Sequence, residues 1–177
     1  MKGNNYIDKI KLVLNLTKEL VVFIGILLSF FIVMSVLGHQ GHPILWASIL
    51  IIFSITKIYF LVSHTFKKLD ALIKSNHSFN HMLLLLGAII TLIITSFAID
   101  YLCVSEIYLD AFSGIQSNQP ILSRFTNLLY FSIVTFTTVG YGDITPTNPV
   151  SKIISVFEMM SAFVVIVFII SKYFRNN

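Results

Sequence analysis

Long apolar runs separated by short polar segments dominate the hydrophobic pattern of the chain. Residues 20–37 and 82–99 contain no charged side chain, and residues 43–63 contain a single lysine. Residues 150–173 form a fourth run, in which Glu158 is the acidic residue. Because a helix needs about 20 apolar residues to cross a bilayer, the pattern predicts an all-α membrane protein with four transmembrane helices.

A shorter apolar run, residues 125–136, lies between the last two predicted spans. It is too short to cross a bilayer and is typical of a re-entrant helix, which Ser123 can cap. The sequence TTVGYGD follows directly at residues 137–143. Its two alternating glycines permit an extended strand with unusual dihedral angles at every second position. Irregular backbone at membrane depth is tolerated only where protein or water surrounds it, and ions can satisfy its carbonyls.

Composition and charge exclude several classes of protein. The chain is 56% apolar and 11% charged, whereas a soluble domain has about 25% charged residues. This composition excludes a soluble enzyme and a nucleic-acid-binding domain. Ten of the 12 basic residues fall on one side of the predicted spans if Lys57 snorkels to that side, which leaves Arg124 and Lys152 opposite. By the positive-inside rule we expect both termini to be cytoplasmic, with Asp100 and Asp143 on the other side.

Two basic amphipathic stretches, around residues 10–20 and 64–74, are expected on the cytoplasmic side. Such helices lie in the plane of the lipid headgroups, and we favour this anchoring role. The alternative is that residues 64–74 form a lever between the second and third spans. The first span, 20–37, is expected to be retained, because its 18 apolar residues exceed the core of a signal peptide and no cleavage motif follows.

TTVGYGD, placed after a short apolar helix and between two spans, resembles the selectivity filter of prokaryotic potassium channels with a two-transmembrane pore domain. The resemblance covers residues 82–173, about half of the chain. The chain differs from the usual pattern by two additional predicted spans before this region. It implies an N-terminal part at 1–81 with an amphipathic segment, two spans and a linker, and a pore domain at 82–177. Within the pore domain it implies an outer helix at 82–102, a pore helix at 124–136, a filter at 137–143 and an inner helix at 150–173.

The resemblance also implies residue roles. The ion-binding groups would be the backbone carbonyls of Thr138, Val139, Gly140 and Tyr141, with the Thr138 hydroxyl, which replace water around K⁺. Gly142 would permit the backbone twist.

Further residues would support the filter. Asp143 would lie at its outer mouth, and Thr135 and Thr137 would pack behind it. Tyr130 stands where many relatives have a tryptophan and could still reach Asp143. Ala162 stands where a hinge glycine is common, so we expect bending of the inner helix to be harder.

Two charged residues inside spans need an explanation. Glu158 lies eight residues past Val150, about 12 Å into the membrane at 1.5 Å per residue. Such a carboxyl is a functional-site hypothesis. It either braces the pore helix through Thr135 or Thr137, which we favour, or gates by protonation. Lys57 is explained by snorkelling of its ammonium group to the membrane surface.

The function implied by the resemblance is passive, K⁺-selective conduction across the plasma membrane. One strand cannot enclose an ion, so we expect a homotetramer in contact with membrane lipids, with K⁺ in the filter and no organic cofactor. The first two spans lack the repeated basic residues of a conventional voltage sensor. Because only Asn176 and Asn177 follow Arg175, a cytosolic regulatory subunit would be a separate chain.

Other functions fit less well. The alternative is a non-conducting or modulatory subunit that assembles with another channel or a cytosolic gating protein, although an intact filter argues against it. A transporter would typically show internal repeats. No nucleophile, base and orienting group converge in the sequence, so we do not expect an enzyme.

Overall fold

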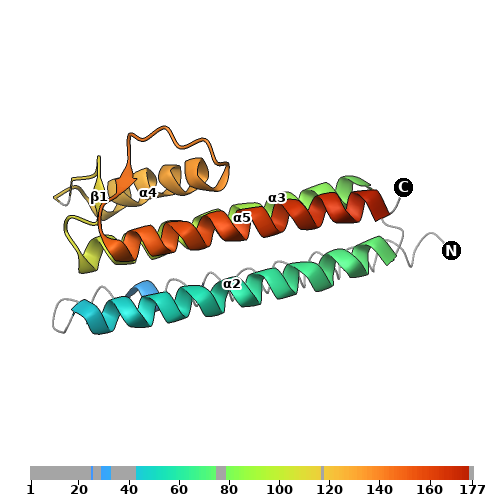
Figure 1. Cartoon of the computed structure of the whole chain (residues 1–177), viewed down its shortest axis with the longest axis horizontal. Helices are drawn as coiled ribbons and strands as arrows, with labels where there is room; N and C mark the ends of the chain where they lie inside the picture. The colour runs from blue at the N-terminus through green and yellow to red at the C-terminus, as the bar shows by residue number, and fades with distance from the viewer. Residues whose placement is uncertain (1–24, 26–28, 33–42, 75–78, 117, 176–177) are drawn as a thin grey trace.

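The computed structural model describes residues 25, 29–32, 43–74, 79–116 and 118–175. In this part of the chain, three helices are long and apolar enough to cross a membrane, and they run side by side in Figure 1. They are α2 (Pro43–Lys74), α3 (Phe79–Ile107) and α5 (Pro149–Arg175). The shorter helix α4 (Ile121–Phe136) lies along one end of this bundle, between α3 and α5 in the sequence. The predicted all-α membrane fold is confirmed, while most of the first span and the stretch at 10–20 lie outside the described residues.

Helix α3 packs against α2, α4 and α5, and it is the most buried of the three long helices. Ten consecutive residues, 96–105, are buried on every side of the helix. A helix that is buried all round belongs to a core, and buried polar groups in a core are normally hydrogen-bonded. Asp100 and Tyr101 of α3 have such partners on the neighbouring helices.

Helix α2 continues without a break to Lys74, so the prediction of a separate surface helix at 64–74 is wrong. After Pro43 the sequence of α2 contains neither proline nor glycine, and nothing in it interrupts helical hydrogen bonding. At 1.5 Å per residue, its 32 residues extend for about 48 Å. This length exceeds the hydrocarbon thickness of about 30 Å, so α2 reaches well beyond the membrane core.

The other helix ends also differ from the predicted bounds. Helix α3 begins before residue 82 and ends beyond residue 102, because hydropathy marks the lipid-crossing part of a helix and not its full length. Ser123 does not cap α4: the N-cap is Pro120, no side chain caps the helix, and Ser123 lies within its first turn. Helix α5 follows the usual rule, with Pro149 in its first turn and the backbone N–H of Val150 donating to Asn148 Oδ1 at 2.9 Å.

A short antiparallel ladder ties the chain after α3 to the chain that leads into α5. Strand β1 (Phe112–Ser113) pairs with β2 (Thr145–Pro146). Gly114 follows β1 with φ +86°, and a Cβ at this position would lie 2.2 Å from the carbonyl oxygen of Asp143. Glycine is therefore required here both by its left-handed backbone and by the close approach of a second chain segment.

Three aromatic rings fill the space where this ladder meets α3 and α4. Tyr101, Phe112 and Phe131 pack edge to face, with ring centroids 5.0–5.5 Å apart. This geometry is the one that aromatic pairs favour. At the start of α4, Arg124 forms an ion pair with Glu106 at the end of α3. These contacts fix the position of α4 against the central helix.

Candidate functional site

Helix α4 is apolar but too short to span a membrane. Its 16 residues extend for about 24 Å. One face of the helix is buried, and a polar residue, Ser132, lies within it. The buried residues are Arg124, Leu128, Phe131, Ser132, Val134 and Phe136. Residues 137–143 follow directly at the C-terminal end of this helix.

The backbone of residues 137–143 alternates in handedness. Thr138, Gly140 and Gly142 have φ values of 59°, 59° and 79°, whereas Val139 and Tyr141 between them are not in the left-handed region. A threonine with positive φ is uncommon and marks a strained position. The alternation therefore reaches one position further toward the N-terminus than the two glycines alone predict.

The carbonyl groups of this segment are free for a ligand. The N–H groups of Thr138 and Val139 donate back to the carbonyls of Thr135 and Val134, each at 3.0 Å. In contrast, no hydrogen bond from the described residues reaches the carbonyls of residues 138–142. Unpaired carbonyls are costly away from water, so a cation that they coordinate would supply what the chain does not.

The predicted supporting residues lie around this segment. Thr135 is partly buried in the last turn of α4, and the Thr137 hydroxyl donates to the carbonyl of Ile133 at 2.7 Å. The Tyr130 side chain lies close enough to Asp143 to interact with its carboxylate. This contact joins the middle of α4 to the end of the 137–143 segment.

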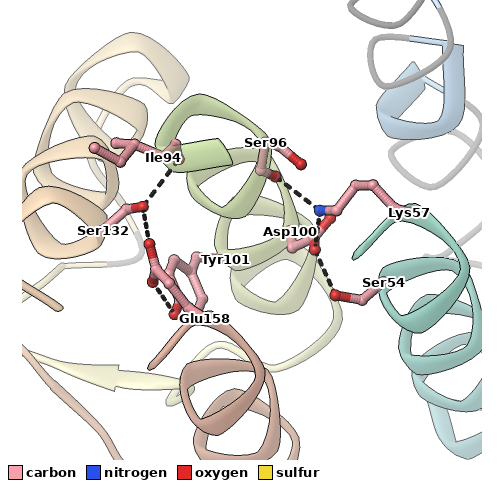
Figure 2. Close-up of polar contacts among 8 residues, drawn as sticks. All are labelled: Ser54, Lys57, Ile94, Ser96, Asp100, Tyr101, Ser132 and Glu158. Carbon is pink, nitrogen blue, oxygen red and sulfur yellow. Dashed lines mark hydrogen bonds and ion pairs between the residues drawn. The ribbon is translucent and has the colours of Figure 1, made fainter. Parts of the chain in front are cut away.

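Glu158 of α5 is fully buried and contacts two helices at once (Figure 2). The Tyr101 hydroxyl of α3 donates to Glu158 Oε2 at 2.5 Å. Ser132 of α4 contacts Glu158 Oε1, and its hydroxyl also lies 2.9 Å from the carbonyl of Ile94. Glu158 therefore does contact α4, but through Ser132, and not through the expected Thr135 or Thr137.

The reason is the direction of the side chains. Ser132 lies on the buried face of α4, where it meets α3 and α5. Thr137 lies beyond the helix end, is exposed, and bonds to its own helix instead. Ala162, one turn after Glu158, is also fully buried, within a helix that continues from Pro149 to Arg175.

Lys57 does not snorkel, which corrects the prediction for this residue. Its ammonium group is buried in the bundle, where it forms an ion pair with Asp100 and donates to the carbonyl of Ser96 at 3.2 Å. Asp100 is likewise buried in α3 and does not lie in a loop outside the membrane. Its Oδ2 also accepts a hydrogen bond from the Ser54 hydroxyl at 2.8 Å. Lys57 is therefore removed from the basic residues that define the cytoplasmic side.

Reasoning from the sequence missed Asp100, Tyr101 and Ser132 as members of polar clusters. One signal was present for Asp100: it and Lys57 are single opposite charges within apolar stretches of two neighbouring spans. A buried charge needs a partner, so the two could have been paired. Tyr101 and Ser132 carry no comparable signal, because an uncharged hydroxyl in a helix often bonds only to its own backbone.

Comparison with known proteins identifies the family. A family model described as "Ion channel" matches residues 82–176, more than half of the chain. The chain belongs to this ion channel family. The matched region begins near the start of α3 and includes α4, residues 137–143 and α5, so the family assignment and the geometry concern the same part of the molecule.

Relatives of this ion channel chain carry potassium channel names. It is 33% identical to Two-pore potassium channel 4 of Arabidopsis thaliana over 90 residues, which are 51% of this chain and 29% of that protein. It is 46% identical to Potassium channel K2 of Plasmodium berghei over 44 residues, 25% of this chain and 3% of that protein. It is 42% identical to a hyperpolarization-activated voltage-gated potassium channel of Methanocaldococcus jannaschii over 41 residues, 23% of this chain and 20% of that protein. The matches thus span less than a third of each relative's length, and no solved structure matches the chain.

Proposed function

We propose that this membrane-embedded ion channel chain forms a K⁺-selective channel of the cell membrane, with residues 137–143 as its selectivity filter and both termini in the cytoplasm. The observation that carries the proposal is the backbone of residues 138–142, in which Thr138, Gly140 and Gly142 have positive φ values. The carbonyls of this segment accept no hydrogen bond from the described residues. Rings of backbone carbonyls are the groups that replace the hydration shell of K⁺ in potassium channels. The names of the relatives support K⁺ as the ion.

The chain would act as a homotetramer, because one strand supplies carbonyls to only one side of an ion. The exposure of residues 137–143 supports this assembly. Val139 and Tyr141, an apolar and an aromatic residue of this segment, are 53% and 71% exposed in the single chain. Symmetry-related copies would cover these side chains and complete the coordination of the ion.

Helix α5 supports the same assembly through its two faces. Its exposed face is apolar and includes Val156, Met160, Phe163 and Val167, at a spacing of four, three and four residues. Glu158 lies about 140–200° around the helix from these positions at 100° per residue. The exposed face would line the ion path or contact a neighbouring copy, whereas Glu158 would support α4 and the filter from behind.

The remaining roles follow from the contacts. Asp143 would place negative charge at the outer mouth while Tyr130 holds it against α4. Thr135 and Thr137 would pack at the base of the filter, where the carbonyl of Thr135 accepts the N–H of Thr138. Gly142 would allow the left-handed turn from the filter to Asp143.

Reversal potentials of the purified protein in a planar bilayer test the proposal. With K⁺ on one side and Na⁺ on the other, we expect a reversal potential far from zero, in the direction of K⁺ permeation. Gly140→Ala should abolish conduction, because an alanine at φ +59° is strained and the strand would lose its alternation. Gly87→Ala is the matched control, since a Cβ at Gly87 in α3 meets nothing within 4 Å. A reversal potential near zero in the wild type would reject K⁺ selectivity.

A further inference from the structure

Two polar clusters meet on consecutive residues of α3 (Figure 2). Asp100 is bonded to Lys57 and Ser54 of α2, and the next residue, Tyr101, is bonded to Glu158 of α5. Glu158 in turn contacts Ser132 of α4. Two sets of buried polar contacts, joined through the backbone of α3 between Asp100 and Tyr101, therefore connect α2, which lies outside the region matched by the family model, to α4, the helix that precedes the 137–143 segment.

We propose that Lys57 is a positioning residue for the selectivity filter. By holding Asp100, Lys57 sets the rotation of α3 about its axis and thereby keeps the Tyr101 hydroxyl on Glu158, which holds α4 through Ser132. Helix α2 is then part of the scaffold of the filter, and not only a lipid-facing anchor. This inference rests on the proposed function of residues 137–143.

The geometry around Lys57 makes it a constraint on rotation. Its ammonium group contacts three positions within one turn of α3: the carboxylate of Asp100, the carbonyl of Ser96 and the ring face of Phe97, whose centroid lies 4.7 Å away. Lys57 is only 4% exposed, so water does not compete for these contacts. Any rotation of α3 would move all three partners together and leave a buried charge without compensation.

Tyr101 is sensitive to such a rotation. Its hydroxyl lies at the end of a long side chain, so a small turn of the helix displaces it by more than it displaces the backbone. The ring is held between Phe112 and Phe131 and also lies 6.4 Å from the ring of Phe97, over which the Lys57 ammonium lies. The charge on α2 and the hydroxyl that bonds Glu158 are thus joined through packing as well as through the helix backbone.

The test replaces the ion pair by apolar residues of similar size. In Lys57→Met/Asp100→Leu no charge remains unpaired, and such replacements are often neutral or stabilising, so the protein should fold and assemble like the wild type. We expect the K⁺/Na⁺ permeability ratio nevertheless to fall by at least about threefold, which corresponds to the lower end of coupling energies within one network. Thr56→Val is the matched control, because Thr56 neighbours Lys57 on α2 but is exposed and bonds to its own helix.

A second variant tests whether the two clusters act as one. Tyr101→Phe removes the bond to Glu158 and leaves the ion pair intact. If Lys57 acts through Tyr101, the combined triple variant should be no worse than the more affected of its two parents, because the effects of groups in one network are not additive. An unchanged permeability ratio in assembled Lys57→Met/Asp100→Leu, or effects that multiply in the triple variant, would overturn the inference.

Two further outcomes are distinguishable. If the wild type itself shows no preference for K⁺, the proposed function fails; a selective wild type with an equally selective double variant rejects the role of Lys57 alone. Should the double variant not assemble, Ser54→Ala decides, because it removes one bond to Asp100 without unpairing a charge. A wild-type permeability ratio in Ser54→Ala would then count against the inference.

Discussion

The hydroxyl of Ser132 has one proton and two neighbours that can accept it, the carbonyl of Ile94 and Oε1 of Glu158. A neutral Glu158 satisfies all of these groups, since it can donate to Ser132 while Ser132 donates to Ile94 and Tyr101 donates to Oε2. An ionised Glu158 would require Ser132 to turn its proton away from Ile94. The geometry therefore favours an uncharged carboxyl, for which glutamine is a close mimic. We predict that Glu158→Gln conducts within about twofold of the wild type, a difference below the usual energy of one net hydrogen bond.

Glu158→Leu is expected to lose most of its conduction, because it leaves the hydroxyls of Tyr101 and Ser132 without this partner at a cost of about 1–3 kcal/mol each. Met159→Leu, an exposed neighbour on α5, is the control for a change of side chain alone. Recording all variants between pH 5 and pH 8 checks the charge state of Glu158. The groups that contact Glu158 are Tyr101 and Ser132, and Lys57 and Asp100 act on it at longer range. A pH response of the wild type that disappears in Glu158→Gln would instead identify a protonation gate.

What the sequence reveals at the residue scale depends on whether a residue has a local pattern. TTVGYGD is contiguous, and its glycines signal the unusual backbone that the structure has at Gly140 and Gly142. Glu158 is recognisable as an anomaly because it is acidic in an apolar run. Its partners are not, since Ser132 and Tyr101 come from two other helices and meet Glu158 only after α3, α4 and α5 have packed.

Among the elements, the β1–β2 ladder holds the far end of the 137–143 segment, as α4 holds its near end. The position of this ladder that tolerates a side chain least is Gly114, where a Cβ would lie 2.2 Å from the carbonyl oxygen of Asp143. We predict that Gly114→Ala displaces Asp143, lowers the single-channel conductance and destabilises the protein by about 1–2 kcal/mol or more from the left-handed backbone alone. Thermal unfolding and single-channel recording measure the two effects.

Gly87→Ala is again the informative comparison, because Gly87 lies in α3 with open space around it. Alanine there should be neutral or stabilise by up to about 1 kcal/mol through its higher helix propensity. If Gly114→Ala were as stable and as conductive as Gly87→Ala, the ladder would have no role in holding Asp143.

The elements show where hydropathy stops being informative. Counting apolar residues finds the four apolar runs, but it does not reveal that α2 continues through residues 64–74. A helix segment beyond the lipid can be charged, so hydropathy does not mark it. The start of α4 at Ile121 was missed for a related reason: Ser123 and Arg124 interrupt the apolar pattern, whereas the helix already begins after Pro120. Capping preferences place helix ends only when no stronger local constraint competes.

For the whole molecule, the charge pattern bears on the response to membrane voltage. Each charge that crosses the full field contributes about 2.3 kcal/mol per 100 mV, and Lys57 is the basic residue within the described apolar window of α2. It is paired with Asp100 of α3, so a joint movement of the pair transfers no net charge. A movement of Lys57 alone would have to break the buried ion pair.

We therefore predict that conduction depends only weakly on voltage. The conductance–voltage relation of the channel in symmetric K⁺ should be shallow, and the apolar replacement Lys57→Met/Asp100→Leu should leave its slope unchanged even where selectivity changes. The predicted first span adds no charge of its own, since residues 20–37 contain neither lysine nor arginine. A steep relation, equivalent to several charges moving per channel, would contradict this prediction. If the double variant then flattened that relation, Lys57 would be a moving charge, and its pairing with Asp100 would describe only one of two states of α2.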